Sequence, residues 1–229
     1  MPCQERGLHR PTLHHERMRA FPPFRNESNP MIDVRTITNL HAETVKQWHE
    51  EGIDNRYQGF LNLVCREHQQ NFRLWHEEDM ARETNAADAE LEAVKRRTDK
   101  LNQRRNELIE QLDRAVVDQI QQESDAPLPS SDPNAETPGR IIDRLSSLSV
   151  RIFHLREQAD RQDADERRQR EAESSLETLY EQLNDLSTSL AERVPSLFAG
   201  VIRPHLHRET RAGNDLARIS RRHKSKKAA

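Results

Sequence analysis

The sequence predicts an all-α protein, an antiparallel bundle of about five long helices with disordered N- and C-terminal tails. Three observations lead to this prediction. Charged residues are as frequent as hydrophobic ones, at 33% each, which suits long helices with narrow apolar faces. Apolar residues recur every three or four positions over long stretches, which is the period of an amphipathic helix. Glycine occurs only 6 times and aromatic residues make up 4%, so the β-branched and aromatic runs that strands favour are missing.

The first regular pattern begins at Met31. Residues 1–30 are rich in Pro, Arg and His and lack periodicity, so we expect a disordered tail there and predict that Met31 is the true start of the protein. A first helix is expected over about residues 33–51. It is supported by Ile37, Leu40, Thr44 and Trp48, which share one face. The turn residues of "GIDNRYQG" end it.

Two longer helices follow. The second is expected over about residues 58–84, with Phe60, Val64 and Trp75 on its apolar face. "NAAD" forms a short turn, and the third helix covers about residues 87–121. Its apolar face consists of Leu91, Val94, Leu101, Leu108, Leu112, Val116 and Ile120.

A Pro/Ser-rich linker, residues 122–137, separates the third helix from the fourth. Thr137 is predicted to cap the fourth helix and Pro138 to occupy its first position, where a missing N–H costs nothing. This helix is expected to run to about residue 163. The charged stretch "RQDADERRQREAE" continues it as a solvated helix or a hinge.

The fifth helix carries a leucine seam with alternating spacings of three and four, as in a coiled coil. The seam consists of Leu176, Leu179, Leu183, Leu186 and Leu190. Pro195 is expected to end this helix. The bundle domain is therefore predicted over residues 31–195, followed by a basic flexible tail at 196–229.

Charge and composition narrow the classes of partner. Residues 203–229 hold nine Lys or Arg and two acids, whereas the whole chain has a net charge of −3, so the helical body is acidic. An acidic body argues against nucleic-acid binding. No apolar run is long enough to span a membrane, and no signal peptide or disulfide framework is visible. We therefore expect a cytoplasmic protein.

Several polar residues are predicted to face the interior of the bundle. At 100° per residue, four polar side chains of the second helix fall within 60° of Val64, while His76 falls on the flank and Glu77 in solvent. His41 lies on the face of Trp48, and His49 lies about 100° away from it. His154 lies opposite Leu145, so it is either exposed or packed against a different neighbour. The resulting candidate ligand-binding residues are His41, Trp48, His68, Asn71, Trp75, Asp79, Arg82, Asn102 and Arg105.

These inward residues allow two interpretations. Buried charges are normally paired, so the histidines and Asp79 can be satisfied core residues in a closed network. Alternatively they line a polar pocket in the bundle, and the excess of arginine over acid favours an anionic ligand. No HExxH motif and no pair of ExxH motifs is present, so no metal and no cofactor is expected. The metal alternative is convergence of His41, His68 and Asp79 from two helices.

The sequence also resembles a known family. The segments "LHAETVKQWHE", "GFLNLV", "HQQNFRLWHEEDMAR", "VKRRTDKLNQRRNELIEQLD" and "ETPGRIIDRLSSLSVRIFHLREQ" are similar to the bacterial domain-of-unknown-function family 4254, over about residues 34–160. The resemblance implies a helical fold and no established activity. Its members are often encoded near glycosyltransferase and surface-polysaccharide genes. They tend to end in a "KMYNDP"-like segment, of which only Asn214 and Asp215 persist here.

Two functional hypotheses follow, and whether the protein is an enzyme stays open. In the first, a polar or cationic pocket in the core binds a small anionic ligand, in a surface-polysaccharide or glycosyl-transfer pathway. In the second, the protein is a non-enzymatic scaffold or adaptor, and its leucine seam contacts a protein partner or a second copy of the chain.

Overall fold

The computed structural model describes residues 32–83, 88–123, 136–160 and 166–198, and these contain five helices and no strand. The all-α prediction is confirmed. The helices are α2 (Val34–Glu51), α3 (Gly59–Glu83), α4 (Asp88–Glu123), α5 (Pro138–Ala159) and α6 (Glu166–Phe198). None of these helices is long and apolar enough to cross a bilayer. The predicted N-terminal tail, residues 199–229 of the predicted C-terminal tail and most of the linker at 122–137 lie outside the described residues, whereas residues 196–198 belong to α6.

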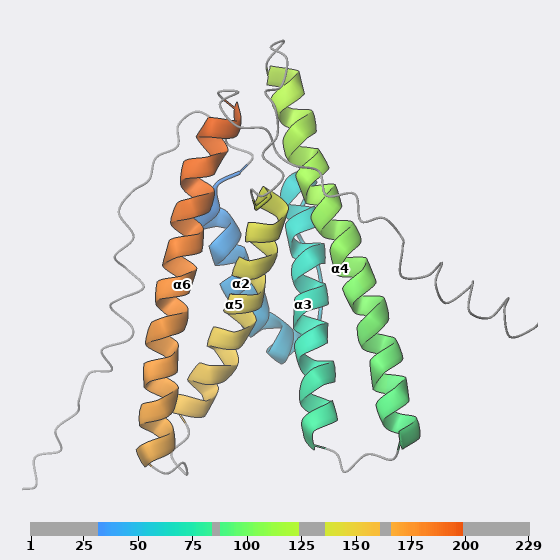
Figure 1. Ribbon diagram of the computed structural model, residues 1–229, viewed down its shortest axis with the longest axis vertical. Coiled ribbons are helices and arrows are strands. Elements are labelled where there is room, and N and C mark those ends of the chain that lie inside the picture. Colours follow the sequence, from blue (N-terminus) through green and yellow to red (C-terminus); the bar gives the residue numbers. More distant parts are fainter. Residues whose placement is uncertain (1–31, 84–87, 124–135, 161–165, 199–229) are drawn as a thin grey trace, which may run out of the picture. The chain divides into compact units, whose positions relative to one another are not determined.

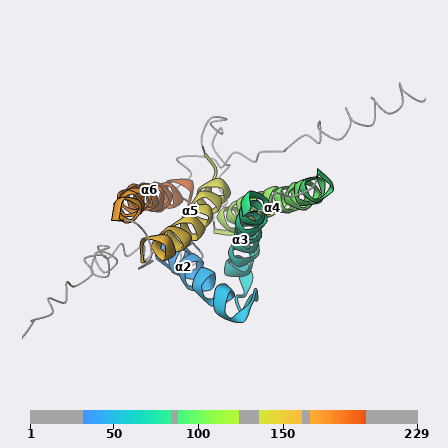
Figure 2. The ribbon, with the colours of Figure 1, turned by 90° about the horizontal axis from the view of Figure 1, so that it is seen from below.

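The helices pack as an antiparallel bundle with α5 at its centre. All described residues belong to one compact unit, Met31–Ala229, in which α5 contacts α2, α3, α4 and α6. Chain direction reverses at each step from α3 to α6 (Figure 1). Helix α2 crosses behind α5 in the view of Figure 1 and lies beside it in Figure 2. Because α5 packs against four helices, Ile142, Ser146 and Val150 are buried together with the predicted face of Ile141 and Leu145, while Arg144 and Arg151 stay exposed.

The apolar face of α4 is buried along only part of its length. Leu108 and Leu112 are 1% and 0% exposed, whereas Leu91 is 45% exposed. The N-terminal half of α4 runs beside the C-terminal half of α3, at the end of the bundle where α3 and α5 diverge (Figure 1). The apolar sequence pattern of α4 is therefore longer than the part of this helix that is buried in the core.

The leucine seam of α6 packs inside the chain. Leu176, Leu179, Leu186 and Leu190 are buried in the same core as α5. The helix also continues past Pro195 to Phe198, so the prediction that Pro195 ends it was wrong. Proline removes one N–H donor, but burial of Val194 and Leu197 on either side holds the last turn against the core.

The start of α2 is fixed by a single side chain. Asp33 accepts hydrogen bonds from the backbone N–H groups of Arg35 and Thr36, at 3.3 and 3.1 Å, which satisfies donors that the first turn leaves open. We expect Asp33→Ala to lower the free energy of unfolding by about 1 kcal/mol in urea denaturation. Asp33→Asn retains the acceptor and serves as the control. Equal losses in both variants would contradict a capping role.

Candidate metal centre and the buried polar network

A chain of hydrogen bonds crosses the core from α5 to α2 through His68. The Oγ of Ser146 lies 2.7 Å from His68 Nδ1, and His68 Nε2 lies 3.1 Å from the carbonyl oxygen of His41. A carbonyl only accepts, so Nε2 carries the proton and Nδ1 accepts from the Ser146 hydroxyl. Both nitrogens of His68 are thus occupied, and burial lowers the pKa of His68 to about 3, which keeps the ring neutral.

The same network continues to a buried acid pair. The side-chain amide of Asn71 donates to Glu67 Oε1 at 2.6 Å and to Asp143 Oδ1 at 2.9 Å, and Asn71 Oδ1 accepts from Arg105 at 3.2 Å. Glu67 is fully buried, and burial together with the charge of Asp143 raises its pKa well above the usual range. Burial thus favours the protonated form of the Glu67 carboxyl in the folded protein. This cluster is a structural network that ties α3 to α5, with one cation, Arg105, at its edge, although Glu67 Oε2 and Arg105 Nε have no hydrogen-bond partner among the described residues.

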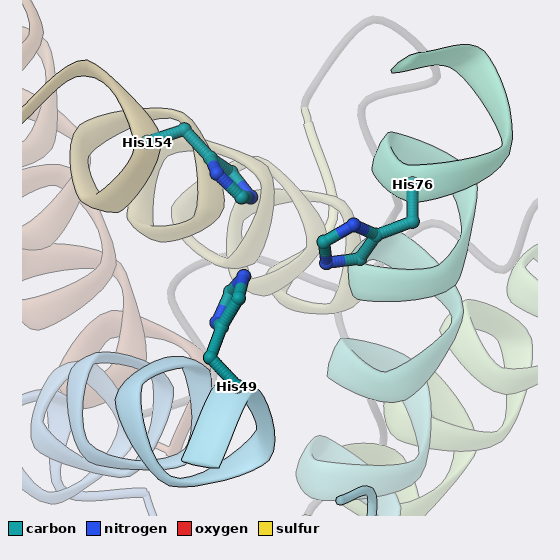
Figure 3. Close-up of side chains that lie close together, drawn as sticks. All are labelled: His49, His76 and His154. Carbon is teal, nitrogen blue, oxygen red and sulfur yellow. The ribbon is translucent and has the colours of Figure 1, made fainter. Parts of the chain in front are cut away.

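Three other histidines, none of them in the predicted set, come together on the flank of this core. His49 lies at the C-terminal end of α2, His76 in α3 and His154 in α5, and their rings point toward one another (Figure 3). One ring nitrogen from each can be chosen so that all three lie within 4.8 Å of one another. Segments more than 100 residues apart in sequence thus supply one cluster of imidazole ligands.

Hydrogen bonds leave Nε2 of each ring available. His49 Nδ1 lies 2.7 Å from the carbonyl oxygen of Val45 and therefore donates to it. His154 Nδ1 lies 3.4 Å from the Glu157 carboxylate. Nε2 of His76 and of His154 is buried and has no partner among the described residues. Metal-binding histidines characteristically donate their second ring nitrogen to a carbonyl or carboxylate in this way.

Aromatic side chains hold the three rings in place. Trp75 stacks on His154 with centroids 4.9 Å apart and planes 6° apart, and Phe153 stacks on His49 at 4.4 Å. Burial is the largest cause that lowers the pKa of His76 and of His154, followed in each by the charge of His49. Neutral imidazole is the form that binds metal, so at neutral pH these two rings are ready to coordinate.

The cluster fits a first-row transition metal after a small closure. Tetrahedral Zn²⁺ with Zn–N bonds of about 2.0–2.1 Å places its ligand nitrogens about 3.4 Å apart. The 4.8 Å span of the three nitrogens must therefore shorten by about 1.4 Å at most. Three neutral nitrogens leave a fourth position open, which is the arrangement of catalytic rather than structural zinc sites.

A surface pocket of about 500 Å³ adjoins the cluster and shares His76 with it, and Phe72 also lines this pocket. Phe72 touches both His76 and His49, with centroids 4.5 and 4.9 Å apart. The rest of the pocket is formed by α3, α4 and Ile53, which follows α2. The candidate metal centre is thus connected to a space of small-molecule size.

The sequence-predicted residues divide between these two places. His41, Trp48 and His68 lie together, with the His68 ring centroid 4.5 Å from that of His41 and 5.1 Å from that of Trp48. Asn71 and Arg105 join them through the network described above. Trp75 lies instead against His154, and Asn102 is half-buried on α4. The side chain of Arg82 lies outside the described part of the structure.

The trio of His41, His68 and Asp79 is not assembled. His68 has no free lone pair, and Asp79 follows it by eleven residues, about 16 Å along the helix. The charge of Asp79 instead acts on His76, whose pKa it raises against the effect of burial. His41 is fully buried, and neither of its ring nitrogens has a hydrogen-bond partner in the described residues.

Sequence reasoning missed the histidine cluster because it looked for ligands on one strong apolar face per helix. A signal was present. Each of the three histidines directly follows an aromatic residue, as Trp48–His49, Trp75–His76 and Phe153–His154. The next position on a helix is turned by 100°, so such a histidine sits at the edge of the buried face. Ser146 was missed for a related reason, since α5 is buried on more than one face, and Glu67 was missed because it lies at the edge of the predicted apolar face of α3.

Comparison with known proteins returns one family. The family model described as "Protein of unknown function (DUF4254)" matches residues 61–205, which include α3, α4, α5 and α6. His76, His154, the acid pair and the pocket residues of α3 and α4 lie within this range, whereas His49 precedes it. No curated protein and no solved structure matches the chain.

Proposed function

We propose that this chain, which belongs to the DUF4254 family of proteins of unknown function, binds a divalent transition-metal ion through His49, His76 and His154. The observation that carries the proposal is the convergence of three imidazoles from α2, α3 and α5, with the other nitrogen of His49 and of His154 directed at a carbonyl and a carboxylate. Imidazole ligands suit zinc, copper, nickel and iron, and zinc is the ion to test first.

The three imidazole ligands determine the chemistry of an ion bound at this site. Three neutral ligands leave the full charge of the ion in place and one coordination position open. An ion of this kind acts as a Lewis acid toward an oxygen ligand and lowers the pKa of a bound water molecule. The histidines position the ion, Glu157 and the Val45 carbonyl orient the rings, and Trp75 and Phe153 keep water from one side of each stacked ring.

Metal binding is expected to be stoichiometric and to depend on each histidine. Isothermal titration of the metal-free protein with Zn²⁺ should give one site per chain, and His154→Ala or His76→Ala should weaken binding at least about tenfold. Cobalt substitution should give the intense visible absorption of a four-coordinate ion. Circular dichroism of each variant checks that loss of binding is not loss of folding.

The C-terminal sequence contains His205 and His207, which makes a double alanine variant at these positions a matched control. It should bind zinc as wild type does. Zinc binding that survives His76→Ala and His154→Ala but disappears in the control would assign the metal to the terminal histidines and overturn the proposal. Absence of any stoichiometric zinc, copper, nickel, cobalt or iron binding by folded protein would overturn it as well.

The scaffold hypothesis depends on a free leucine seam. Leu176, Leu179, Leu186 and Leu190 are packed inside the described core and offer no face to a partner. The exposed large apolar side chains of the described residues are Ile53, Met80 and Leu91, at 36%, 50% and 45%, and the last two lie near the end of the bundle where α3 and α4 meet. Nothing in the described structure favours a particular protein partner for that end.

A further inference from the structure

The pocket beside the histidine cluster has an apolar lining and a cationic rim. Phe72, Met80 and Leu101 supply apolar surface from α3 and α4. Its volume of about 500 Å³ lies in the range of small-molecule sites, about 300–1,000 Å³. The space therefore suits a ligand with an apolar body.

Charges at the rim favour an anion. Arg97 is held by Glu77, with its Nε 2.8 Å from both carboxylate oxygens, so this pair is neutral as a whole. Arg73 and Lys100 also line the pocket, are exposed, and make no ion pair within the described residues. The pocket thus carries two cations beyond its internal pair. A guanidinium and an ammonium converging on one space recognise phosphate or carboxylate groups.

We propose that this pocket binds a small organic anion with an apolar body, for which an aryl phosphate is the model, and that the anionic group reaches the metal held at His76. The second half of this inference rests on the proposed metal centre, and the first half does not. His76 lines the pocket and belongs to the cluster at once, so an anion held by Arg73 and Lys100 lies beside the open coordination position. The apolar body lies against Phe72, Met80 and Leu101.

Each part of the ligand has its own role. The apolar body contributes through burial against the lining, and the charged group through hydrogen bonds to the two cations. Neither inorganic phosphate nor phenol offers both, so each should bind more weakly than phenyl phosphate. The sequence-based hypothesis of a small anionic ligand is thereby moved from the buried network around Arg105 to the open pocket between α3 and α4.

The test is a titration of the full chain with phenyl phosphate, performed on zinc-loaded and on metal-free protein. Arg73→Met with Lys100→Met removes both rim cations and should weaken binding about tenfold or more while leaving zinc affinity unchanged. Arg96→Met is the matched control, since Arg96 is an exposed arginine of α4 paired with Glu92 and does not line the pocket. It should bind phenyl phosphate as wild type does.

The outcomes separate the two halves of the inference. Binding that requires Arg73 and Lys100, and that is stronger with zinc than without, supports both halves. Binding that requires the two cations but is the same with and without bound zinc supports the anion pocket and overturns its contact with the metal. No binding at millimolar phenyl phosphate, or binding unchanged in the double variant, overturns the pocket. Failure of zinc to bind is measured separately and overturns the metal centre alone.

Discussion

Acidification is expected to destabilise the wild-type protein more steeply than a His68→Gln variant. In the folded protein burial lowers the pKa of His68 from 6.5 to about 3, whereas the unfolded chain titrates near the ordinary value. Between these values the unfolded chain binds a proton that the fold excludes. The contribution of His68 to stability is therefore highest above pH 6.5 and falls as the pH drops toward 3, by on the order of 5 kcal/mol in total.

The comparison with His68→Gln isolates this residue from its neighbours. The pKa of His41 is lowered by burial and by His68, so His41 acts in the same direction, while the raised pKa of Glu67 acts in the opposite one. Both are present in both proteins. Denaturant unfolding at a series of pH values should show the wild-type free energy falling more steeply, by about 1.4 kcal/mol per pH unit, because one additional proton is taken up on unfolding.

Ser146→Ala is the matched control for this prediction. It removes the hydroxyl that donates to His68 Nδ1 but leaves the titrating ring, so its stability should be lower at every pH with the wild-type slope. Parallel curves for wild type and His68→Gln would show that the folded protein protonates His68, and would contradict the neutral buried ring.

The sequence correctly predicted the features that depend on a single helix, namely its cap and its buried face. Thr137 caps α5 and Pro138 occupies its first turn, as predicted from the dipeptide, because both effects are local to the helix end. The inward placement of His41, His68 and Asn71 followed from rotation about one axis and is confirmed by their burial. Helix periodicity thus predicts the elements and the strongest face of each.

Features that depend on contacts among several helices could not be predicted from the sequence. Helix α5 packs against four other helices, so it is buried on more than one face, and a search for one apolar face could not place Ser146 or His154. The histidine cluster needs α2, α3 and α5 at once, and no spacing within one helix encodes it. Linear metal motifs exist where two ligands share a helix, which none of these three histidines do.

The polar network around His68 and the histidine cluster around His76 differ in whether their unpartnered polar atoms adjoin a pocket. Around His68 the ring nitrogens and the Asn71 amide are hydrogen-bonded to α2, α3 and α5, while Glu67 Oε2 and both His41 nitrogens are fully enclosed without a partner among the described residues. Around His76 the acceptor nitrogens face each other with no internal partner, beside a pocket with two cations that are not paired within the described residues. Both regions contain unpartnered polar atoms, and the contact of His76 with a pocket is what distinguishes the histidine cluster as a ligand site.

Helix α5 approaches α4 very closely at Gly139. A Cβ built on Gly139 would lie 2.7 Å from the Ile109 carbonyl oxygen and 2.8 Å from Asp113 Oδ1, both closer than real Cβ contacts. The Asp113 carboxylate accepts from the Gly139 N–H at 2.7 Å, and burial raises its pKa to about 6. The backbone oxygen of α4 cannot move without shifting the helix.

Gly139→Ala is therefore expected to lower the free energy of unfolding by about 2 kcal/mol or more, although alanine favours helix formation by about 1 kcal/mol. Thermal or urea unfolding at pH 7 measures the change, and Arg151→Ala, at an exposed position of the same helix, controls for helix propensity. Gly139→Ala as stable as wild type would mean that α4 and α5 are farther apart than described. The close approach at Gly139 allows α5 to lie against α4, and α5 carries His154 of the histidine cluster.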